Sequence, residues 1–312
     1  MYSLVVPVYR NEASIPELLG VLGEMNEKLG RRLEVVFVVD GSPDRSSELL
    51  QERLPRCAFR SRLILLSRNF GAFAAIRAGL SEARGPYFAT MAADLQEPPE
   101  LALTSFETLE SEPVDVTIAA REGRSDPLLS RWASTLFWAL YRSFVQPEMP
   151  RGGVDMFGCN VAFRDRLLTL GESNTTLVGL LFWLGFRRKL IGYERRARRH
   201  GRSAWTVGRK FRYLMDSVFA FSDLPIRILV FAGAVGLGLS MLLTVTVVVA
   251  RVSGRIQVPG YAATVVVIVF FAALNTFGLG IIGSYVWRAF ENTKERPPSI
   301  VMSSQHFDGE RG

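Results

Sequence analysis

Short apolar runs and amphipathic segments alternate along the first 121 residues of the chain. Short, mostly apolar runs, which favour buried strands, occur at 3–9, 33–40, 62–67, 87–93 and 115–121. Segments with apolar residues at helical spacing lie between them, at 14–29, 42–54, 71–84 and 100–110. This alternation predicts an α/β fold with an open, mostly parallel sheet.

Two much longer apolar runs lie near the C-terminus, at 226–250 and 261–287. Each exceeds the roughly 20 residues that cross a bilayer, so we expect a transmembrane helical hairpin. Lys and Arg flank its open end more heavily than its loop, which predicts a cytoplasmic N-terminal domain and tail. The alternative, two buried core helices, remains open. The expected parts are a catalytic domain at 1–205, an interfacial helix at 206–225, the hairpin at 226–290 and a tail at 291–312.

Two amphipathic segments rich in aromatic residues accompany this pattern. The segment 211–222 directly precedes the first apolar run, so we expect it to lie at the membrane surface. The segment 128–145 is equally compatible with a core helix. The tail residues 296–304 are predicted to form a short strand.

Notable polar residues follow the predicted strands, where an open α/β sheet binds its ligands. These residues are Tyr9 to Glu12, Asp40, Arg68 with Asn69, Asp94 to Glu97, and Arg121. Their shared position at strand ends predicts an active site at the carboxyl edge of the sheet.

Composition and charge narrow the class of protein. Hydrophobic residues make up 48% of 312 residues, which is high for a purely soluble protein. Residues 187–212 hold eleven Lys and Arg against one acid and so carry +10, which leaves −3 for the rest of a chain of net charge +7. One basic segment next to an apolar run favours phosphate-bearing partners or an anionic membrane surface over nucleic acid. The two cysteines, Cys57 and Cys159, suit free thiols in a reducing compartment, and the N-terminus lacks the pattern of a signal peptide.

Four motifs, "VVPVYRNE", "VVDGSPD", "LSRNFGAFAAIRAGL" and "ADLQEPPE", occur in the order seen in family 2 glycosyltransferases of the GT-A fold. With the predicted hairpin, the chain resembles the polyprenyl-phosphate glycosyltransferases, including dolichol-phosphate mannose synthases and bacterial undecaprenyl-phosphate glucosyl and aminoarabinosyl transferases. The resemblance covers nearly the whole chain. It implies a GT-A catalytic domain that moves a sugar from a nucleotide-sugar donor to polyprenyl phosphate.

The resemblance implies a divalent metal, Mg²⁺ or Mn²⁺, held by Asp94 and Gln96. The family motif usually reads Asp-x-Asp-x-Gln, whereas this chain has Ala92 at the first aspartate position. The donor diphosphate and water could complete the coordination of such an ion. We therefore expect weaker metal binding than with two carboxylates, and Glu97 is a possible substitute ligand.

The first loops of the chain match the family's nucleotide-binding loops. The expected nucleotide-binding residues are Pro7, Tyr9, Glu12, Asp40 and Arg68. Two alternatives remain open here: a plain turn at 40–43, and a helix cap at Arg68 and Asn69.

The resemblance also implies the groups that act at the reacting centre. The expected catalytic residues are Asp155, Arg121, Arg195 and Arg198, and the expected lipid-phosphate ligands are Arg131, Ser134 (or Thr135) and Arg202. The family usually has a lysine where this chain has Ala204, and we expect Arg202, two residues earlier and at a different backbone position, to supply that charge. Asp155 has a structural alternative as the N-cap of a helix beginning near Cys159.

These expectations describe a multi-pass enzyme of the inner (plasma) membrane with a cytoplasmic catalytic domain, and a homotetramer by resemblance. The sugar and nucleotide are not identified, although a UDP-sugar is favoured. Two rivals remain: a glycosyltransferase with another lipid acceptor, such as diacylglycerol, and a catalytically impaired scaffold that binds nucleotide sugar. The second rival rests on Ala92 and Ala204.

Overall fold

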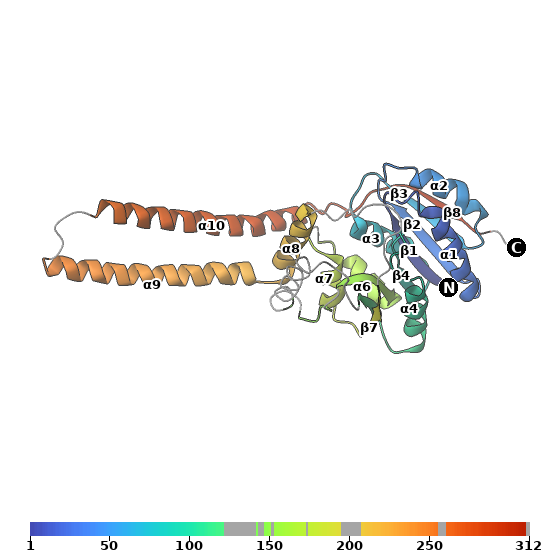
Figure 1. The fold of residues 1–312 in the computed structure, drawn as a ribbon, viewed down its shortest axis with the longest axis horizontal. Helices are drawn as coiled ribbons and strands as arrows, with labels where there is room; N and C mark the ends of the chain where they lie inside the picture. The colour runs from blue at the N-terminus through green and yellow to red at the C-terminus, as the bar shows by residue number, and fades with distance from the viewer. Residues whose placement is uncertain are drawn as a thin grey trace.

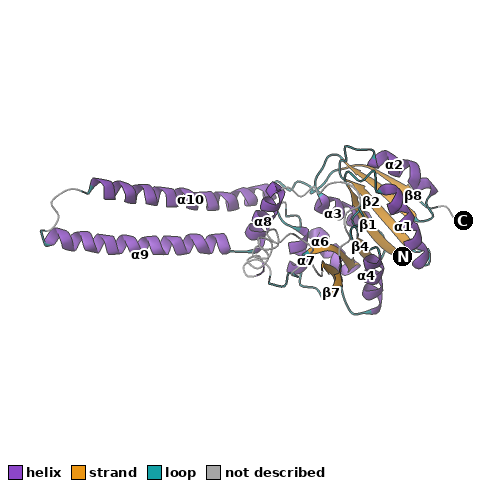
Figure 2. Ribbon diagram, in the orientation of Figure 1, coloured by secondary structure: helices purple, strands orange, loops and turns teal. Residues whose placement is uncertain are grey.

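The computed structural model describes residues 1–121, 142, 147–150, 153–172, 174–194, 207–254 and 260–309. Within this part of the chain, eight strands form one mixed sheet (Figure 2). Their order is β7-β5-β6-β4-β1-β2-β3-β8. The strands are β1 (Tyr2–Val8), β2 (Leu33–Val39), β3 (Arg60–Leu66), β4 (Tyr87–Thr90), β5 (Val116–Arg121), β6 (Val154–Asn160), β7 (Arg188–Tyr193) and β8 (Val301–Phe307).

The first four strands are parallel where they pair, as the βα alternation predicts. Three helices connect them: α1 (Ile15–Lys28), α2 (Ser46–Arg53), which continues into the short helix η1 (Leu54–Arg56), and α3 (Ala72–Glu82). Every residue of β2 is buried, because helices cover both faces of the sheet. The predicted α/β architecture is therefore confirmed for this half of the sheet.

Alternate residues of β1 point into two separate cores. Leu4, Val6 and Val8 pack with α1, α2 and α4 (Glu100–Ser111), whereas Val5 packs with the helices of the other face. Those helices are α3, α6 (Val161–Thr169) and α7 (Leu177–Trp183). The period-2 alternation of a strand thus produces three layers, with the sheet between two layers of helices.

The remaining strands make the sheet mixed rather than wholly parallel. β6 is antiparallel to both β4 and β5, and β7 runs parallel to β5. The predicted tail strand is present as β8, a few residues later than expected, and it pairs antiparallel with β3. β6 and β7 were not predicted from the hydrophobic pattern.

Three helices lead away from the sheet: α8 (Val207–Phe221), α9 (Leu224–Val252) and α10 (Tyr261–Thr293). Figure 1 shows α9 and α10 extended side by side, with α8 at the base next to α7. Phe270–Thr293 is long and apolar enough to cross a membrane, and the bent pair Leu214–Phe221 with Leu224–Gly236 would be a second span if counted as one. A hairpin that crosses the bilayer twice stays a prediction.

Three cations at the start of the basic segment 187–212 have acidic partners. Arg187 pairs with Asp115, Arg188 with Glu148 and Lys189 with Glu112. Arg187 directly precedes β7, and Arg188 and Lys189 are its first two residues. These three of the eleven cations are therefore paired within the fold, and the role of the remaining eight stays a prediction. Residues 195–206, which hold the rest of the predicted arginine motif, lie outside the described part, as does nearly all of 128–145.

Candidate active site

The loop after β1 is fastened to the loop after β2 by side-chain hydrogen bonds. The backbone N–H of Arg10 donates to Ser42 Oγ at 2.8 Å, and that of Glu12 donates to Asp44 at 3.1 Å. In return, Glu12 Oε2 accepts from the Arg45 N–H at 3.0 Å. These hydrogen bonds join the two loops at the carboxyl ends of β1 and β2. The predicted nucleotide-binding residues Pro7, Tyr9 and Glu12 lie at this end of β1.

Asp40 fixes a third loop to the same edge. Its Oδ1 accepts from the Phe70 N–H at 2.7 Å and its Oδ2 from the Gly71 N–H at 2.8 Å. Asp40 is 2% exposed, and burial raises the pKa of its carboxyl group even though the two amides and Arg68 favour the charged form. Asp40 therefore anchors the loop before α3 to the end of β2, and its contact with a nucleotide stays a prediction. The N-cap of α3 is Gly71, so the helix-cap alternative for Arg68 and Asn69 is wrong.

Gly41 permits the close approach of these loops. Its φ of +56° lies in the left-handed region, and a Cβ there would lie 2.4 Å from the Arg68 carbonyl carbon and 2.5 Å from the Asn69 nitrogen. The "D-G-S" motif therefore has a steric reason for its glycine. Arg68 itself is exposed, with its guanidinium carbon 4.0 Å from the centroid of the Phe70 ring.

The turn after β4 holds the predicted metal ligands. Asp94 Oδ1 accepts from the Gln96 N–H at 3.3 Å, and Asp94 is partly exposed whereas Gln96 and Glu97 are buried. Leu95 between them has a φ of +52°, an uncommon conformation for a non-glycine residue and one that clusters at functional sites. Among the described residues, no group of three or more His, Cys, Asp or Glu side chains is placed to hold a metal ion. An ion at Asp94 would therefore need oxygens from a substrate and from water.

A cluster of three side chains lies at the carboxyl edge of the sheet. It consists of Arg121 at the end of β5, Tyr193 at the end of β7, and Asp155 near the start of the antiparallel strand β6. Arg121 Nη2 donates to Asp155 Oδ2 at 2.7 Å, and the Tyr193 hydroxyl donates to the same oxygen. Arg121 and Tyr193 are direct neighbours in the β5–β7 ladder. The β5–β6 register shifts between Ala119 and Ala120, which face Met156 and Val154, so Asp155 is the extra residue of a bulge. A bulge redirects side chains, often near active sites, and here it places Asp155 against Arg121.

The electrostatics of this cluster favour a charged arginine and a neutral tyrosine. Burial and the Asp155 carboxylate raise the pKa of Tyr193 far above its ordinary value, with a smaller effect from Glu97. Burial alone would lower the pKa of Arg121, but its pairing with Asp155 outweighs burial and raises it. Tyr193 therefore stays protonated and donates a hydrogen bond to Asp155.

The remaining predicted site residues lie in different parts of the chain. Asp155 lies in β6, and the helix that follows is capped by Asn160, whose side chain accepts from the Phe163 N–H at 3.0 Å. The N-cap alternative for Asp155 is therefore wrong. The predicted residues Arg131, Ser134, Arg195, Arg198 and Arg202 lie outside the described residues. Sequence reasoning missed Tyr193, although the short apolar run "LIGY" inside a basic segment is a strand signal.

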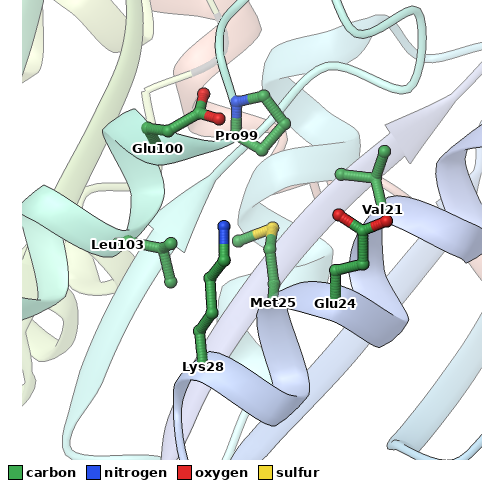
Figure 3. Close-up of a pocket in the computed structure, with 7 residues that line it drawn as sticks. All are labelled: Val21, Glu24, Met25, Lys28, Pro99, Glu100 and Leu103. Atoms are coloured by element: carbon green, nitrogen blue, oxygen red, sulfur yellow. The ribbon is translucent and has the colours of Figure 1, made fainter.

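A pocket of about 180 Å³ lies between α1 and α4 (Figure 3). Its lining residues are Val21, Glu24, Met25, Lys28, Pro99, Glu100 and Leu103. Pro99 closes the turn that carries Asp94, but none of the predicted site residues in the described part lines this pocket. The chemistry-bearing side chains are gathered at the strand ends instead.

The comparisons with known proteins agree with this arrangement. The family model "Glycosyl transferase family 2" matches residues 3–170. The chain is 30% identical to "Uncharacterized glycosyltransferase YkcC" of Bacillus subtilis strain 168, over 99% of this chain and 96% of that protein. It is 33% identical to "Undecaprenyl-phosphate 4-deoxy-4-formamido-L-arabinose transferase" of Pseudomonas paraeruginosa strain PA7, over 96% and 89%. It is 27% identical to "Prophage bactoprenol glucosyl transferase homolog" of Escherichia coli strain K12, over 96% and 97%.

The family model spans more than half of the chain and covers β1 to α6, including every described candidate residue except Tyr193. The mixed α/β sheet with its polar carboxyl edge is the GT-A arrangement that the four motifs implied. The chain therefore belongs to glycosyl transferase family 2 and is a glycosyltransferase.

Proposed function

We propose that this glycosyltransferase moves a sugar from a nucleoside-diphosphate sugar to polyprenyl phosphate, with inversion at the anomeric carbon. The observation that carries the proposal is the Arg121–Asp155–Tyr193 cluster at the carboxyl edge of the sheet, in a chain that continues into two long helices. Two relatives that align over nearly the whole chain are named for undecaprenyl-phosphate or bactoprenol as the acceptor. Their sugars differ, so the proposal names the acceptor class and leaves the sugar open, with a UDP-sugar favoured.

The donor would lie across the braced loops. Pro7, Tyr9, Glu12, Asp40 and Arg68 would bind the nucleotide, because their loops are held together at one end of β1 to β3. Arg121 would face the diphosphate. It stays charged at any working pH, and its delocalised guanidinium suits phosphate oxygens.

A divalent ion, Mg²⁺ or Mn²⁺, would bind at the turn after β4 between the protein and the donor diphosphate. The partly exposed Asp94 carboxylate, with Gln96 beside it, would hold the ion together with diphosphate oxygens and water. When bound, the ion would neutralise charge on the departing nucleoside diphosphate. With Ala92 in place of a second carboxylate, the chain offers less negative charge than the usual family motif.

A phosphate acceptor does not require a strong catalytic base. A phosphate monoester has a second pKa near 6, so most of it is already ionised at pH 7. One phosphate oxygen would form a bond to the anomeric carbon as the bond to the nucleoside diphosphate breaks. The dominant requirement is then stabilisation of developing negative charge. Arg121, with Arg195 and Arg198, would meet it, and Asp155 would position the reacting groups or act as a modest base.

The long helices suit a lipid substrate. A polyprenyl chain needs the bilayer, whereas its phosphate lies at the headgroup level. We propose that α9 and α10 cross the inner membrane, that α8 lies at the interface, and that the sheet faces the cytoplasm. Arg131, Ser134 and Arg202 would bind the lipid phosphate. A homo-oligomer, a tetramer by resemblance, belongs to this proposal too.

The deciding experiment measures nucleoside diphosphate release by the detergent-purified full chain, with a panel of nucleotide sugars. Three acceptors are compared: undecaprenyl phosphate, undecaprenol and diacylglycerol. Release with one sugar only in the presence of undecaprenyl phosphate is the expected result. Release with undecaprenol or diacylglycerol would support the rival acceptor, which needs Asp155 as a base for a hydroxyl. Nucleotide binding without release would support the scaffold, which Ala92 and Ala204 favour.

A further inference from the structure

Tyr193 stands apart from the residues that the family motifs identify. It lies at the last position of β7, is 6% exposed, and its hydroxyl donates to Asp155 Oδ2. β7 is an edge strand of the sheet, next to β5, and β5 lies between β7 and β6. Three strands thus each supply one side chain to the cluster: Arg121, Asp155 and Tyr193.

The geometry depends on both the ladder and the bulge. Arg121 and Tyr193 are paired residues of parallel strands, so their side chains leave the sheet on the same face. Asp155 reaches that face because it is the extra residue between Val154 and Met156 in the β6 bulge. Without hydrogen bonds from its neighbours, a carboxylate at such a bulge would adopt several orientations. Two donors that converge on one oxygen restrict it to one.

Within the described part of the chain, the phenol of Tyr193 lies among three charged groups. The charged groups that face it are Asp155 from β6, Arg121 from β5 and Glu97 from the turn after β4. The side chains of Asp155 and Arg121 are 22% and 18% exposed, so the cluster lies at the border of the fold where a substrate can reach it. The Tyr193 hydroxyl stays protonated, because burial and the Asp155 carboxylate raise its pKa.

We propose that Tyr193 is a positioning residue for the sugar transfer: it fixes the Asp155 carboxylate, jointly with Arg121, in the orientation that the reacting groups require. This inference rests on the proposed function and adds a residue that the family motifs do not include. Tyr193 acts through Asp155 and need not touch either substrate.

The test compares Tyr193→Phe with a matched control, Tyr2→Phe. Tyr2 is also a buried tyrosine, 3% exposed, whose hydroxyl donates to a carboxylate, Glu110 Oε2, at 2.6 Å. It lies at the first position of β1, at the opposite edge of the sheet from the candidate site. Both variants lose one hydroxyl and one hydrogen bond to a carboxylate, and Tyr2→Phe also removes the acceptor of a hydrogen bond from Arg32 Nη2 at 3.2 Å. The control therefore covers the general effects on folding.

The loss of one charge-assisted hydrogen bond at the reacting centre predicts a fall of about tenfold in kcat for Tyr193→Phe. The KM for the nucleotide sugar should change by less than about twofold, and Tyr2→Phe should keep the wild-type kcat. In an Asp155→Asn background, Tyr193→Phe should cost less than about twofold more, because the group that it positions is already altered.

Two results would overturn the inference. One is a kcat of Tyr193→Phe equal to that of Tyr2→Phe in an active enzyme. The other is a full additional tenfold loss in the Asp155→Asn background, which would show that Tyr193 acts independently of Asp155. An inactive wild-type chain with every acceptor would contradict the proposed function instead, so the two failures are distinguishable.

Discussion

Arg288 on α10 and Asp216 on α8 form an ion pair, with 2.8 Å between Nη2 and Oδ1, although 72 residues separate them. Their side chains are 19% and 24% exposed. Arg288 Nη1 also donates to the Asn174 carbonyl at 3.2 Å, and the guanidinium carbon lies 5.0 Å from the centroid of the Phe219 ring. One side chain therefore joins α10 to α8 and to the loop that precedes α7.

Replacement of this side chain should uncouple the long helices from the sheet. Arg288→Ala leaves Asp216 without its cation in a partly buried site, so we expect a loss of about 2 kcal/mol of stability. The apparent KM for undecaprenyl phosphate should rise more than that for the nucleotide sugar, because the lipid must be aligned with the sheet edge. Thermal unfolding in detergent and steady-state kinetics with each substrate varied measure both effects.

The chain provides a matched control for this variant. Arg227 and Asp223 form an ion pair at 2.9 Å near the start of α9, with side chains 76% and 64% exposed. Exposed pairs contribute little, typically below about 1 kcal/mol. Arg227→Ala should therefore leave stability and both KM values close to wild type. Equal effects of the two substitutions would contradict the coupling role of Arg288.

Gly41→Ala should weaken nucleotide binding through the Arg68 loop. The new Cβ would lie 2.4 Å from the Arg68 carbonyl carbon, so backbone must move. We expect a loss of about 2 kcal/mol, from the left-handed φ together with the steric overlap, and at least tenfold weaker binding of the nucleotide, measured by calorimetry. Gly30→Ala is the control, because Gly30 has a φ of +63° with nothing within 4 Å of its Cβ position. It should cost about 1 kcal/mol and leave binding unchanged.

Asp115 should make the fold sensitive to acid. Hydrogen bonds from Arg187 lower the pKa of Asp115 from 3.8 to about 2, with Asn160 adding to the effect against the opposing influence of burial. Because the folded-state pKa lies below the unfolded one, the stabilisation is present above about pH 4 and is lost as the pH falls through about 2. After allowance for solvent screening, it amounts to about 1 kcal/mol.

Thermal unfolding between pH 7 and pH 2.5 tests this prediction. Asp115→Asn should lower the unfolding temperature at pH 7 and flatten its decline below pH 4. Asp165→Asn is the control, since the Asp165 side chain is 58% exposed beside Arg164, and it should keep the wild-type profile. An unchanged acid profile for Asp115→Asn would show that other carboxylates control the transition.

The hydrophobic pattern was sufficient for β1 to β5 and their helices, because strands buried on both faces read as apolar runs. It was insufficient for β7, since "RRKLIGY" begins with three cations whose acidic partners, Asp115, Glu148 and Glu112, are distant in sequence. Only the folded sheet supplies those partners. The three charges therefore made this strand hard to recognise from the sequence.

The candidate site was also only partly predictable from the sequence. The strand-end rule placed Asp40, Asp94 and Arg121 at one edge from sequence alone. The role of Tyr193 could not be predicted, because it depends on the bulge at Asp155 and on the register between β5 and β7. Bulges and long-range register are properties of paired strands, which a local pattern does not encode.

Ala92 offers a direct test of the proposed metal site. Asp94 is the one aspartate that remains of the usual family motif, and affinity for a hard cation increases with the number of charged ligands. Ala92→Asp should therefore lower the Mn²⁺ concentration for half-maximal activity by about tenfold. Ala92 is partly exposed, so the added carboxylate has access to solvent. Mn²⁺ titration of activity, together with electron paramagnetic resonance of bound Mn²⁺, measures the change.

Ala92→Asn is the matched control, because it adds nearly the same volume without a charge. It should leave the Mn²⁺ requirement unchanged, whereas Asp94→Asn should abolish bound Mn²⁺ and lower kcat by at least about a hundredfold. If Ala92→Asp and Ala92→Asn behave alike, the ion does not bind at this turn. Full activity of Asp94→Asn in excess EDTA would go further, since the arginines at the sheet edge would then stabilise the departing diphosphate without a metal.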